Sequence, residues 1–206
     1  MKILSVVAML FFLPCVGAAA PSAGKPSSPP EVAVSSDHPH EAMSPDQIQA
    51  WVSSGVAGIP PLMSALGKAD WEKYTADDCG EEFTGSLLQV TREMTKRSVS
   101  CARAFSEVLK STTTSSGQRY GVLLGLSGVD RVPPPLYDGL VSCLSDTSSG
   151  NRMRASELLA RSGARQAAPA IKAAMTRETD HSTRQRMSYH LYLLGDPAGD
   201  SQALRR

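Results

Sequence analysis

The sequence contains few aromatic residues. Phe, Trp and Tyr make up only 5% of its 206 residues, whereas hydrophobic residues make up 41%. A buried core must therefore consist mainly of Leu, Ala, Val and Met, which favours closely packed helices over a β-sandwich.

The sequence also lacks an excess of charge of either sign. Its 21 Lys and Arg residues balance 20 Asp and Glu residues, for a formal net charge of +1. Proteins that bind nucleic acid through phosphates carry a basic face or stripe. The balanced charge predicts that nucleic acid is not a partner.

Motifs that identify an enzyme are missing. The sequence has no Gly-x-Ser-x-Gly elbow and no phosphate-binding Gly-x-x-x-x-Gly-Lys loop. No cysteine has a convincing histidine partner. We therefore expect no catalytic residue and no cofactor.

Two clusters resemble metal sites, but we expect neither to bind a metal. His38 and His40 lie in a proline-rich segment that supplies no second layer of residues to orient the rings. The acidic residues at 77–82 do not have the spacing of an EF-hand loop, and they suit a helix start.

The N-terminus has the pattern of a secretory signal peptide. Lys2 precedes the apolar residues 3–13, and small residues follow Pro14, so we expect cleavage after Ala18 or Ala19. The apolar run is shorter than the roughly 20 residues that span a bilayer, which predicts no stable membrane insertion after cleavage. Lipidation at Cys15 is the alternative, although Pro14 replaces the small residue expected there.

We expect three segments: a signal peptide at 1–19, a disordered linker at 20–43, and a helical domain at 44–206. Ser44-Pro45-Asp46-Gln47 is typical of a capped helix start, and Gly55 suits the end of that helix. Residues 111–117 have the composition of a loop. The pattern leaves open whether 84–110 forms one helix or two.

Signal removal would leave Cys79, Cys101 and Cys143. The simplest oxidised state is one disulfide and one free thiol, with the pairing left open. The alternative is that the cysteines are small apolar residues packed between helices.

A repeated pattern dominates the C-terminal half. Arg119, Arg154 and Arg186 are 35 and 32 residues apart, and each precedes a glycine by nine residues, at Gly128, Gly163 and Gly195. A proline follows the first two glycines after six residues, at Pro134 and Pro169.

Each repeated residue has a physical role in a helix pair. Glycine ends the first helix at positive φ, and proline fits the first turn of the second. One such pair cannot bury its own apolar face, so neighbouring pairs stack. The fold class expected is all-α, an α-solenoid of antiparallel helix pairs.

Leu193-Leu194-Gly195-Asp196-Pro197, and residues 155–163 followed by Ala168-Pro169-Ala170-Ile171, resemble HEAT repeats of the short bacterial HEAT-like kind. The resemblance covers residues 119–197 well and 46–110 weakly. Val129 and Ala164 stand where the last copy has Asp196, so this loop motif is complete only once. The resemblance implies that the second helices line a concave binding surface.

Charged residues in the repeat suggest structure rather than chemistry. Asp146 and Asp180 precede the next helices and are placed to cap them or to pair with Arg119, Arg154 and Arg186. We expect a structural ladder, so that Arg154→Ala lowers thermal stability without altering partner binding. An anion-binding row is the alternative.

The sequence therefore predicts a periplasmic or secreted scaffold that binds another protein or a peptide. The expected binding face includes Tyr137, Asp138, Val141, Lys172 and Thr176. The alternative function is an accessory subunit or a lyase-like enzyme, an activity that some HEAT-like families carry.

Overall fold

The structure, a computed structural model, describes residues 42–69, 71, 82–201 and 203. Every regular element in these residues is helical, which confirms the predicted all-α class. None of the described helices is long and apolar enough to cross a membrane. The α-helices are α1 (Pro45–Ser53), α2 (Ile59–Leu66), α3 (Glu82–Arg97), α4 (Val99–Lys110), α5 (Ser116–Leu126), α6 (Tyr137–Cys143), α7 (Ser149–Arg161), α8 (Ala168–Arg177) and α9 (His181–Leu193). The 3-10 helices are η1 (Gly55–Gly58), η2 (Pro134–Leu136) and η3 (Arg165–Ala167).

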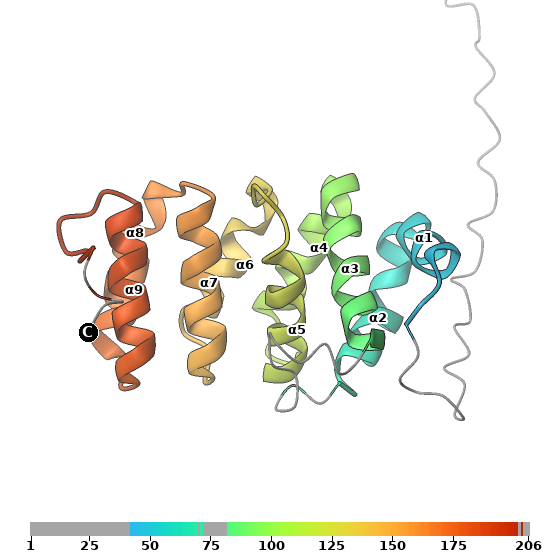
Figure 1. Ribbon diagram of the computed structural model, residues 1–206, viewed down its shortest axis with the longest axis horizontal. Coiled ribbons are helices and arrows are strands. Elements are labelled where there is room, and N and C mark those ends of the chain that lie inside the picture. The colour runs from blue at the N-terminus through green and yellow to red at the C-terminus, as the bar shows by residue number, and fades with distance from the viewer. Residues whose placement is uncertain (1–41, 70, 72–81, 202, 204–206) are drawn as a thin grey trace, which may run out of the picture.

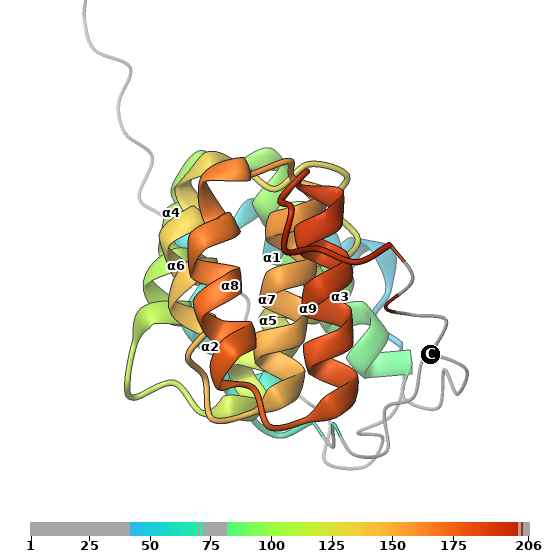
Figure 2. The ribbon, with the colours of Figure 1, turned by 90° about the vertical axis from the view of Figure 1, so that its left-hand side faces the viewer.

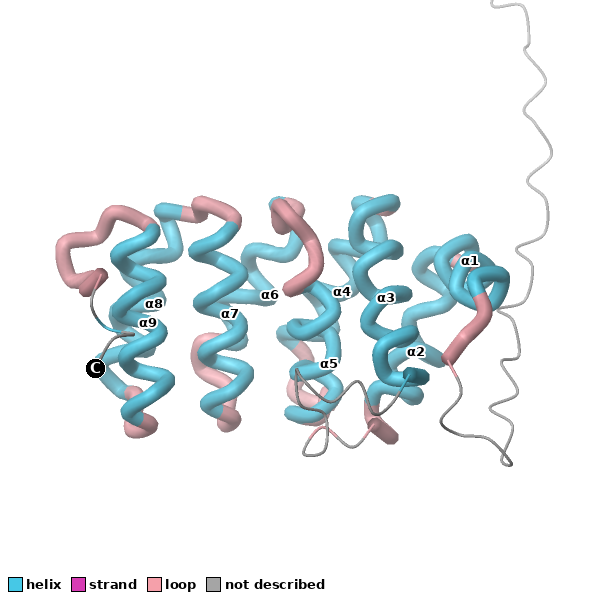
Figure 3. Tube along the Cα trace, viewed as in Figure 1, coloured by secondary structure: helices cyan, strands magenta, loops and turns pink. Residues whose placement is uncertain are grey.

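The α-helices form two rows (Figures 1 and 2). In the first row α1, α3, α5, α7 and α9 pack side by side, each against the next odd-numbered helix. The even-numbered helices form the second row, in which α4 packs closely on α6. The connections gather at two opposite edges of the molecule, as Figure 3 shows.

Side-chain caps fix where several helices begin. Ser44 forms the predicted capping box with Gln47, and Ser115 forms another with Gln118. Because of this second box α5 begins at Ser116, inside the segment predicted to be a loop. Asp180 caps α9 by accepting a hydrogen bond from the backbone N–H of Thr183 at 2.7 Å.

Residues 84–110 contain two helices, because the chain leaves the helical conformation at Ser98. Its backbone is extended, at φ −140° and ψ 115°, and its hydroxyl accepts the N–H of Cys101 at 3.2 Å. This single residue separates α3 from α4. The pair therefore needs no glycine turn, which explains why no glycine marks this copy in the sequence.

Three of the four glycines predicted at helix ends have positive φ: Gly55 at 58°, Gly163 at 67° and Gly195 at 75°. Gly128 does not, so the proposed equivalence of Gly128 with Gly163 and Gly195 is wrong in backbone conformation. The difference lies in the next residue: the N–H of Val129 bonds to the carbonyl of Leu126, three residues back, whereas the N–H groups of Ala164 and Asp196 bond to carbonyls five residues back.

The prolines take two positions. Pro169 lies in the first turn of α8, as predicted, whereas Pro134 lies in η2 just before α6. After α9, Asp196 stabilises the closing turn by accepting the N–H of Ala198 at 2.8 Å, and Pro197 is exposed. Proline at these places loses no hydrogen bond that a helix interior would need.

A continuous core lies between the rows. Leucine dominates its largest fully buried side chains, as the scarcity of aromatic residues requires, and Phe105 is the one aromatic among them. The aliphatic members are Leu62, Leu66, Leu87, Met94, Leu123, Leu126, Leu136, Leu140, Leu158, Leu159 and Ile171.

A glycine stripe on α5 permits close packing. A Cβ atom at Gly121 would lie 2.5 Å from the Trp71 ring, and one at Gly125 would lie 2.8 Å from the Cβ of Thr91 on α3. Trp71 also contacts Tyr120 edge-on at 5.6 Å, and its ring N–H donates to the carbonyl of Leu66 at 3.2 Å. The i, i+4 spacing of these glycines places both on one face of α5 and is visible in the sequence.

Candidate functional site

The second row of helices opens between α6 and α8. α6 packs on α4 and α7, while α8 makes its main contact with α9 and none of comparable extent with α6. A cavity of about 410 Å³ lies at one end of this opening, between the start of α6 and the turn after α7.

The cavity has apolar walls with polar groups at their edge. The segment before α6 contributes Val132, Pro133 and Pro134, and α6 contributes Tyr137, Asp138 and Leu140. The opposite side is formed by Leu159, Ser162, Gly163, Ala164 and Gln166. The side chains of Leu140 and Leu159 belong to the buried core.

Asp138 is the only charged residue among those that line the cavity. It is exposed, as is Gln166, and Tyr137 is half-buried. Within the described part of the chain, no hydrogen bond or ion pair engages the side chains of these three residues, whereas the Ser162 hydroxyl donates to the carbonyl of Leu159 at 2.9 Å. The cavity thus combines apolar walls with polar groups that have capacity to bind a ligand.

The turn that holds Gly163 shapes one wall. Gly163 has a φ of 67°, and the N–H of Ala164 reaches back to the carbonyl of Leu159 at 3.1 Å. This closure directs the chain from α7 into η3 and then into α8. Glycine is needed here because other residues are strained at such a φ.

The structure brings together only part of the predicted binding face. Tyr137 and Asp138 line the cavity, and Val141 lies one turn further along α6, half-buried against the core. Lys172 and Thr176 are exposed on α8 and do not line the cavity. The Thr176 hydroxyl donates to the carbonyl of Lys172 at 2.9 Å.

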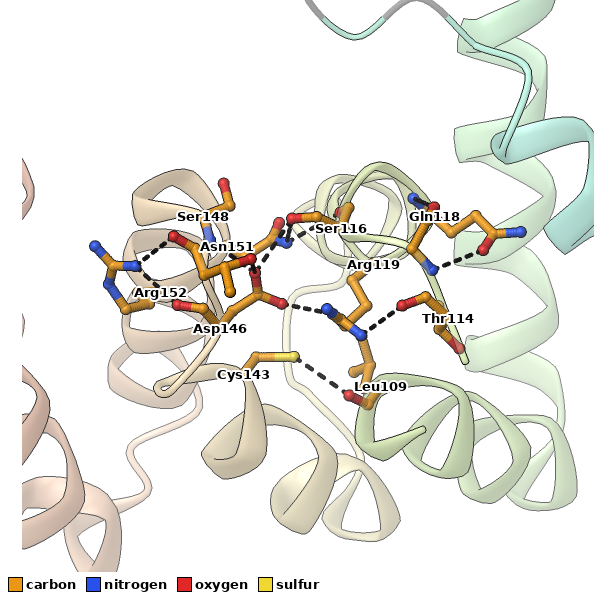
Figure 4. A network of polar contacts seen from close by, with 12 residues as sticks. Leu109, Thr114, Ser116, Gln118, Arg119, Cys143, Asp146, Ser148, Asn151 and Arg152 are labelled. Atoms are coloured by element: carbon orange, nitrogen blue, oxygen red, sulfur yellow. Dashed lines mark hydrogen bonds and ion pairs between the residues drawn. The ribbon is translucent and has the colours of Figure 1, made fainter. Parts of the chain in front are cut away.

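A network of polar side chains occupies the opposite edge, where the odd-numbered helices begin (Figure 4). Asp146 forms an ion pair with Arg119 and accepts the backbone N–H of Ser148 at 2.8 Å. Arg119 also donates to the carbonyls of Ser111 and Thr114, so it joins the loop before α5 to the loop before α7. Asn151 donates to the carbonyl and the hydroxyl of Ser116, both at 3.0 Å.

These contacts keep Asp146 ionised although it is buried. Burial acts most strongly and raises the pKa of this carboxyl. The hydrogen bonds from Ser148, Asn151 and Arg119 outweigh it, so that the pKa lies below its ordinary value of 3.8. An ionised, fully bonded carboxylate of this kind is a structural group rather than a general acid.

The same arrangement recurs one pair later, but with different residues from those predicted. Arg152 pairs with Glu178 and donates to the carbonyls of Asp146 and Thr147, and Arg184 donates to the carbonyl of Glu178. The ladder therefore consists of Arg119, Arg152 and Arg184, with Asp146 and Glu178 as its acids.

The predicted equivalence of Arg154 and Arg186 with Arg119 is wrong by two residues. Arg154 pairs instead with Glu157 on its own helix, at 2.9 Å, and Arg186 is exposed on α9. The reason is helix length: Arg119, Arg152 and Arg184 each lie four residues into their helix, but α5 has 11 residues whereas α7 and α9 have 13, so a constant spacing to the glycine falls two residues too late in α7 and α9. Asp146 is paired with Arg119 as predicted, and Asp180 acts as a helix cap.

His190 is buried between α7 and α9 and bonds to Ser156. Its Nδ1 lies 2.8 Å from the serine hydroxyl, which donates its own hydrogen to the carbonyl of Met153 at 2.7 Å. Nδ1 must therefore carry the hydrogen of a neutral ring. Burial, assisted by Arg186 and opposed by Glu157, lowers the pKa of His190 to about 4. This serine has no activated hydroxyl, so the pair is a packing contact.

The described cysteines are free and buried. Cys101 is 0% exposed and Cys143 is 2% exposed, so no disulfide joins these two. Cys79 lies outside the described residues, as do His38, His40 and the acidic residues at 77–81. In the described segments no group of three or more His, Cys, Asp or Glu residues is arranged to hold a metal ion.

Comparisons with models of protein families, with curated proteins and with solved structures found no match for this chain.

Proposed function

We propose that the protein is an exported α-solenoid of short HEAT-like repeats that binds another protein or a peptide through its second row of helices. The observation that carries the proposal is the opening between α6 and α8, with its cavity of about 410 Å³. Concave or open surfaces of stacked helix pairs are common sites for extended partners. The predicted residues Tyr137 and Asp138 line this cavity, and Lys172 and Thr176 lie on the helix across the opening.

Because we propose that the protein is exported, we expect its partner in the periplasm or outside the cell. The apolar run at 3–13 and the small residues after it are typical of a cleaved signal peptide, which directs the chain to the periplasm or out of the cell. The mass of the protein purified from its native producer tests this directly. A chain that starts at Ala19 or Ala20 is the expected result, whereas an intact N-terminus or a lipid on Cys15 contradicts it.

Affinity capture with surface variants tests the binding face. The protein is immobilised and exposed to envelope and culture-supernatant extracts, and the retained partner is quantified for the unmodified chain, for Tyr137→Ala, and for Lys172→Glu combined with Thr176→Arg. Both variants should retain much less partner, because each changes one border of the opening.

Tyr192→Ala is the matched control, since Tyr192 is an aromatic residue of the first row and is 49% exposed. Its retention should equal that of the unmodified chain. Thermal unfolding of every variant establishes that the fold is kept. The proposed binding face would be refuted if the α6 and α8 variants retained as much partner as the unmodified chain. It would also be refuted if only Tyr192→Ala retained less.

A further inference from the structure

The residues that line the cavity beside α6 limit the kinds of group that a partner can place in it. Its walls are apolar, with prolines on one side and the core side chains of Leu140 and Leu159 behind them. Asp138, at the edge, is the only charged residue in its lining. A ligand that fills this space must therefore place apolar groups inside and tolerate, or complement, one negative charge.

We propose that the cavity binds a basic side chain, arginine or lysine, of a peptide segment in the partner, with Asp138 as the group that recognises its charge. This assignment rests on the proposed binding function and specifies the partner of the same site. Long basic side chains suit such a cavity because their methylene stems pack on apolar surface while the charged head stays at the edge.

The remaining polar groups fit a peptide backbone. The Gln166 amide has both donor and acceptor atoms, and the Tyr137 hydroxyl has both as well. Neither makes a hydrogen bond to another side chain or backbone group in the described part of the chain. Both residues line the cavity together with Asp138, so both are available to the backbone of a peptide that inserts a side chain there.

An acidic or neutral polar ligand fits less well. A carboxylate brought to this cavity would meet the negative charge of Asp138, and among the lining residues no cation offsets it. The nearest basic residues in the sequence, Arg131 and Arg165, are exposed and do not line the cavity. Charge complementarity therefore selects the basic side chain.

Defined peptides test the assignment without knowledge of the natural partner. The probes are acetylated and amidated nonapeptides, identical except for a central arginine, lysine, citrulline or glutamate. Binding to the full chain is measured by NMR titration of the amides of Gly163, Ala164 and Gln166. Citrulline is the matched control, because it keeps the shape of arginine and removes its charge.

The arginine and lysine peptides should shift these three amides, with the citrulline peptide up to about fivefold weaker and the glutamate peptide weaker still. Asp138→Asn should bring the arginine and citrulline peptides to the same affinity, and 0.5 M salt should reduce the difference between them. Tyr192→Ala, an exposed change in the first row, should leave the titrations unaltered.

Equal binding of the glutamate and arginine peptides, no effect of Asp138→Asn, or no shift of the cavity amides by any basic peptide would each overturn the assignment. These outcomes are distinct from failure of the proposed function. If binding of the natural partner is lost on changing Tyr137 and Lys172 but not in Asp138→Asn, only the assignment of a basic side chain is refuted. If none of these changes affects binding, the binding face itself is refuted.

Discussion

Arg152 and Glu178 form a two-point ion pair, with Nε to Oε2 at 2.6 Å and Nη2 to Oε1 at 2.7 Å. The Glu178 side chain is fully covered, and the Arg152 side chain is 18% exposed. Arg152 also donates to two carbonyls of the loop before α7, and Glu178 accepts the N–H of Asp180 at 2.9 Å. One ion pair therefore holds the start of α7 and the start of α9 together.

Replacing Arg152 by alanine should cost about 3 kcal/mol of unfolding free energy, because it leaves the Glu178 carboxylate buried without its partner. Urea denaturation followed by circular dichroism measures this. Arg154→Ala is the control: Arg154 pairs with Glu157 on the same helix and both are about one-quarter exposed, so the loss should be below about 1 kcal/mol. A larger loss for Arg154→Ala than for Arg152→Ala would restore the ladder predicted from the sequence.

His190 should make the protein less stable between pH 6.5 and 4. The pKa of this ring is about 4 in the fold, mainly because of burial, and 6.5 is its ordinary value. Between these pH values the ring is protonated in the unfolded chain but neutral in the folded chain. The stability of the fold is therefore complete above pH 6.5 and is lost as the pH falls toward 4. The total loss should be roughly 2–3 kcal/mol.

His190→Gln should flatten this part of the pH profile, even if it lowers stability at every pH. His181→Gln is the control, since His181 is exposed at the start of α9, and it should keep the slope. Glu178 affects only the lower end of this range. Its pKa is held below the ordinary 4.5, chiefly by the hydrogen bond from Arg152, so its contribution is complete above that pH and is lost only below it. An unchanged slope in His190→Gln would contradict the buried neutral ring.

Gly125→Ala should destabilise the protein by about 1–3 kcal/mol, although alanine is the better helix former. The added Cβ would lie 2.8 Å from the Cβ of Thr91 and 3.2 Å from the carbonyl oxygen of Leu88, so α3 and α5 would have to separate. Gly85→Ala on α3 meets no atom within 4 Å and should stabilise by about 0.5–1 kcal/mol. Thermal melting of the two variants should therefore shift in opposite directions; parallel shifts would show that close packing at Gly125 does not matter.

The Cys143 thiol should resist alkylation in the folded protein. Burial, with a smaller contribution from Asp146 and against the effect of Arg119, raises its pKa from 9.0 to about 12. At a fixed pH the thiolate fraction then falls roughly a thousandfold, and the thiolate is the reactive form. Peptide mapping after maleimide labelling, with and without denaturant, measures the protection. Rapid native labelling of Cys143 would exclude its buried environment.

Local signals in the sequence predicted local structure well. Ser44 and Gln47 form their capping box, and Gly55, Gly163 and Gly195 take positive φ, because caps and left-handed turns depend on a few adjacent residues. The choice between one helix and two at 84–110 depended on Ser98 alone. Serine also occurs inside helices, where its side chain faces solvent or bonds to the preceding turn, so Ser98 by itself did not decide between one helix and two.

The contacts between helix pairs were less predictable. The sequence predicted Arg154 rather than Arg152 because a constant spacing to the glycine assumes helices of equal length, and α5 has 11 residues whereas α7 has 13. The opening beside α6 had no sequence signal at all, because it depends on how α6 and α8 pack on different neighbours. On α6, Tyr137 is half-buried and Asp138 is exposed, and their role in binding a partner stays a prediction.

A change in loop length would have different effects at the two edges of the molecule. At the edge of Arg119, Arg152 and Arg184, each guanidinium fastens a connection to the helix that follows it, so inserting a residue there would separate partners that must meet. The turns at the other edge, among them Gly163, are closed by backbone bonds within a few residues of the same chain segment, and Arg161 adds one bond between pairs, to the carbonyl of Ser127 at 2.7 Å. New loop lengths and new side chains can therefore enter beside the cavity while the stack stays in register, which makes this edge the part of the fold free to acquire specificity.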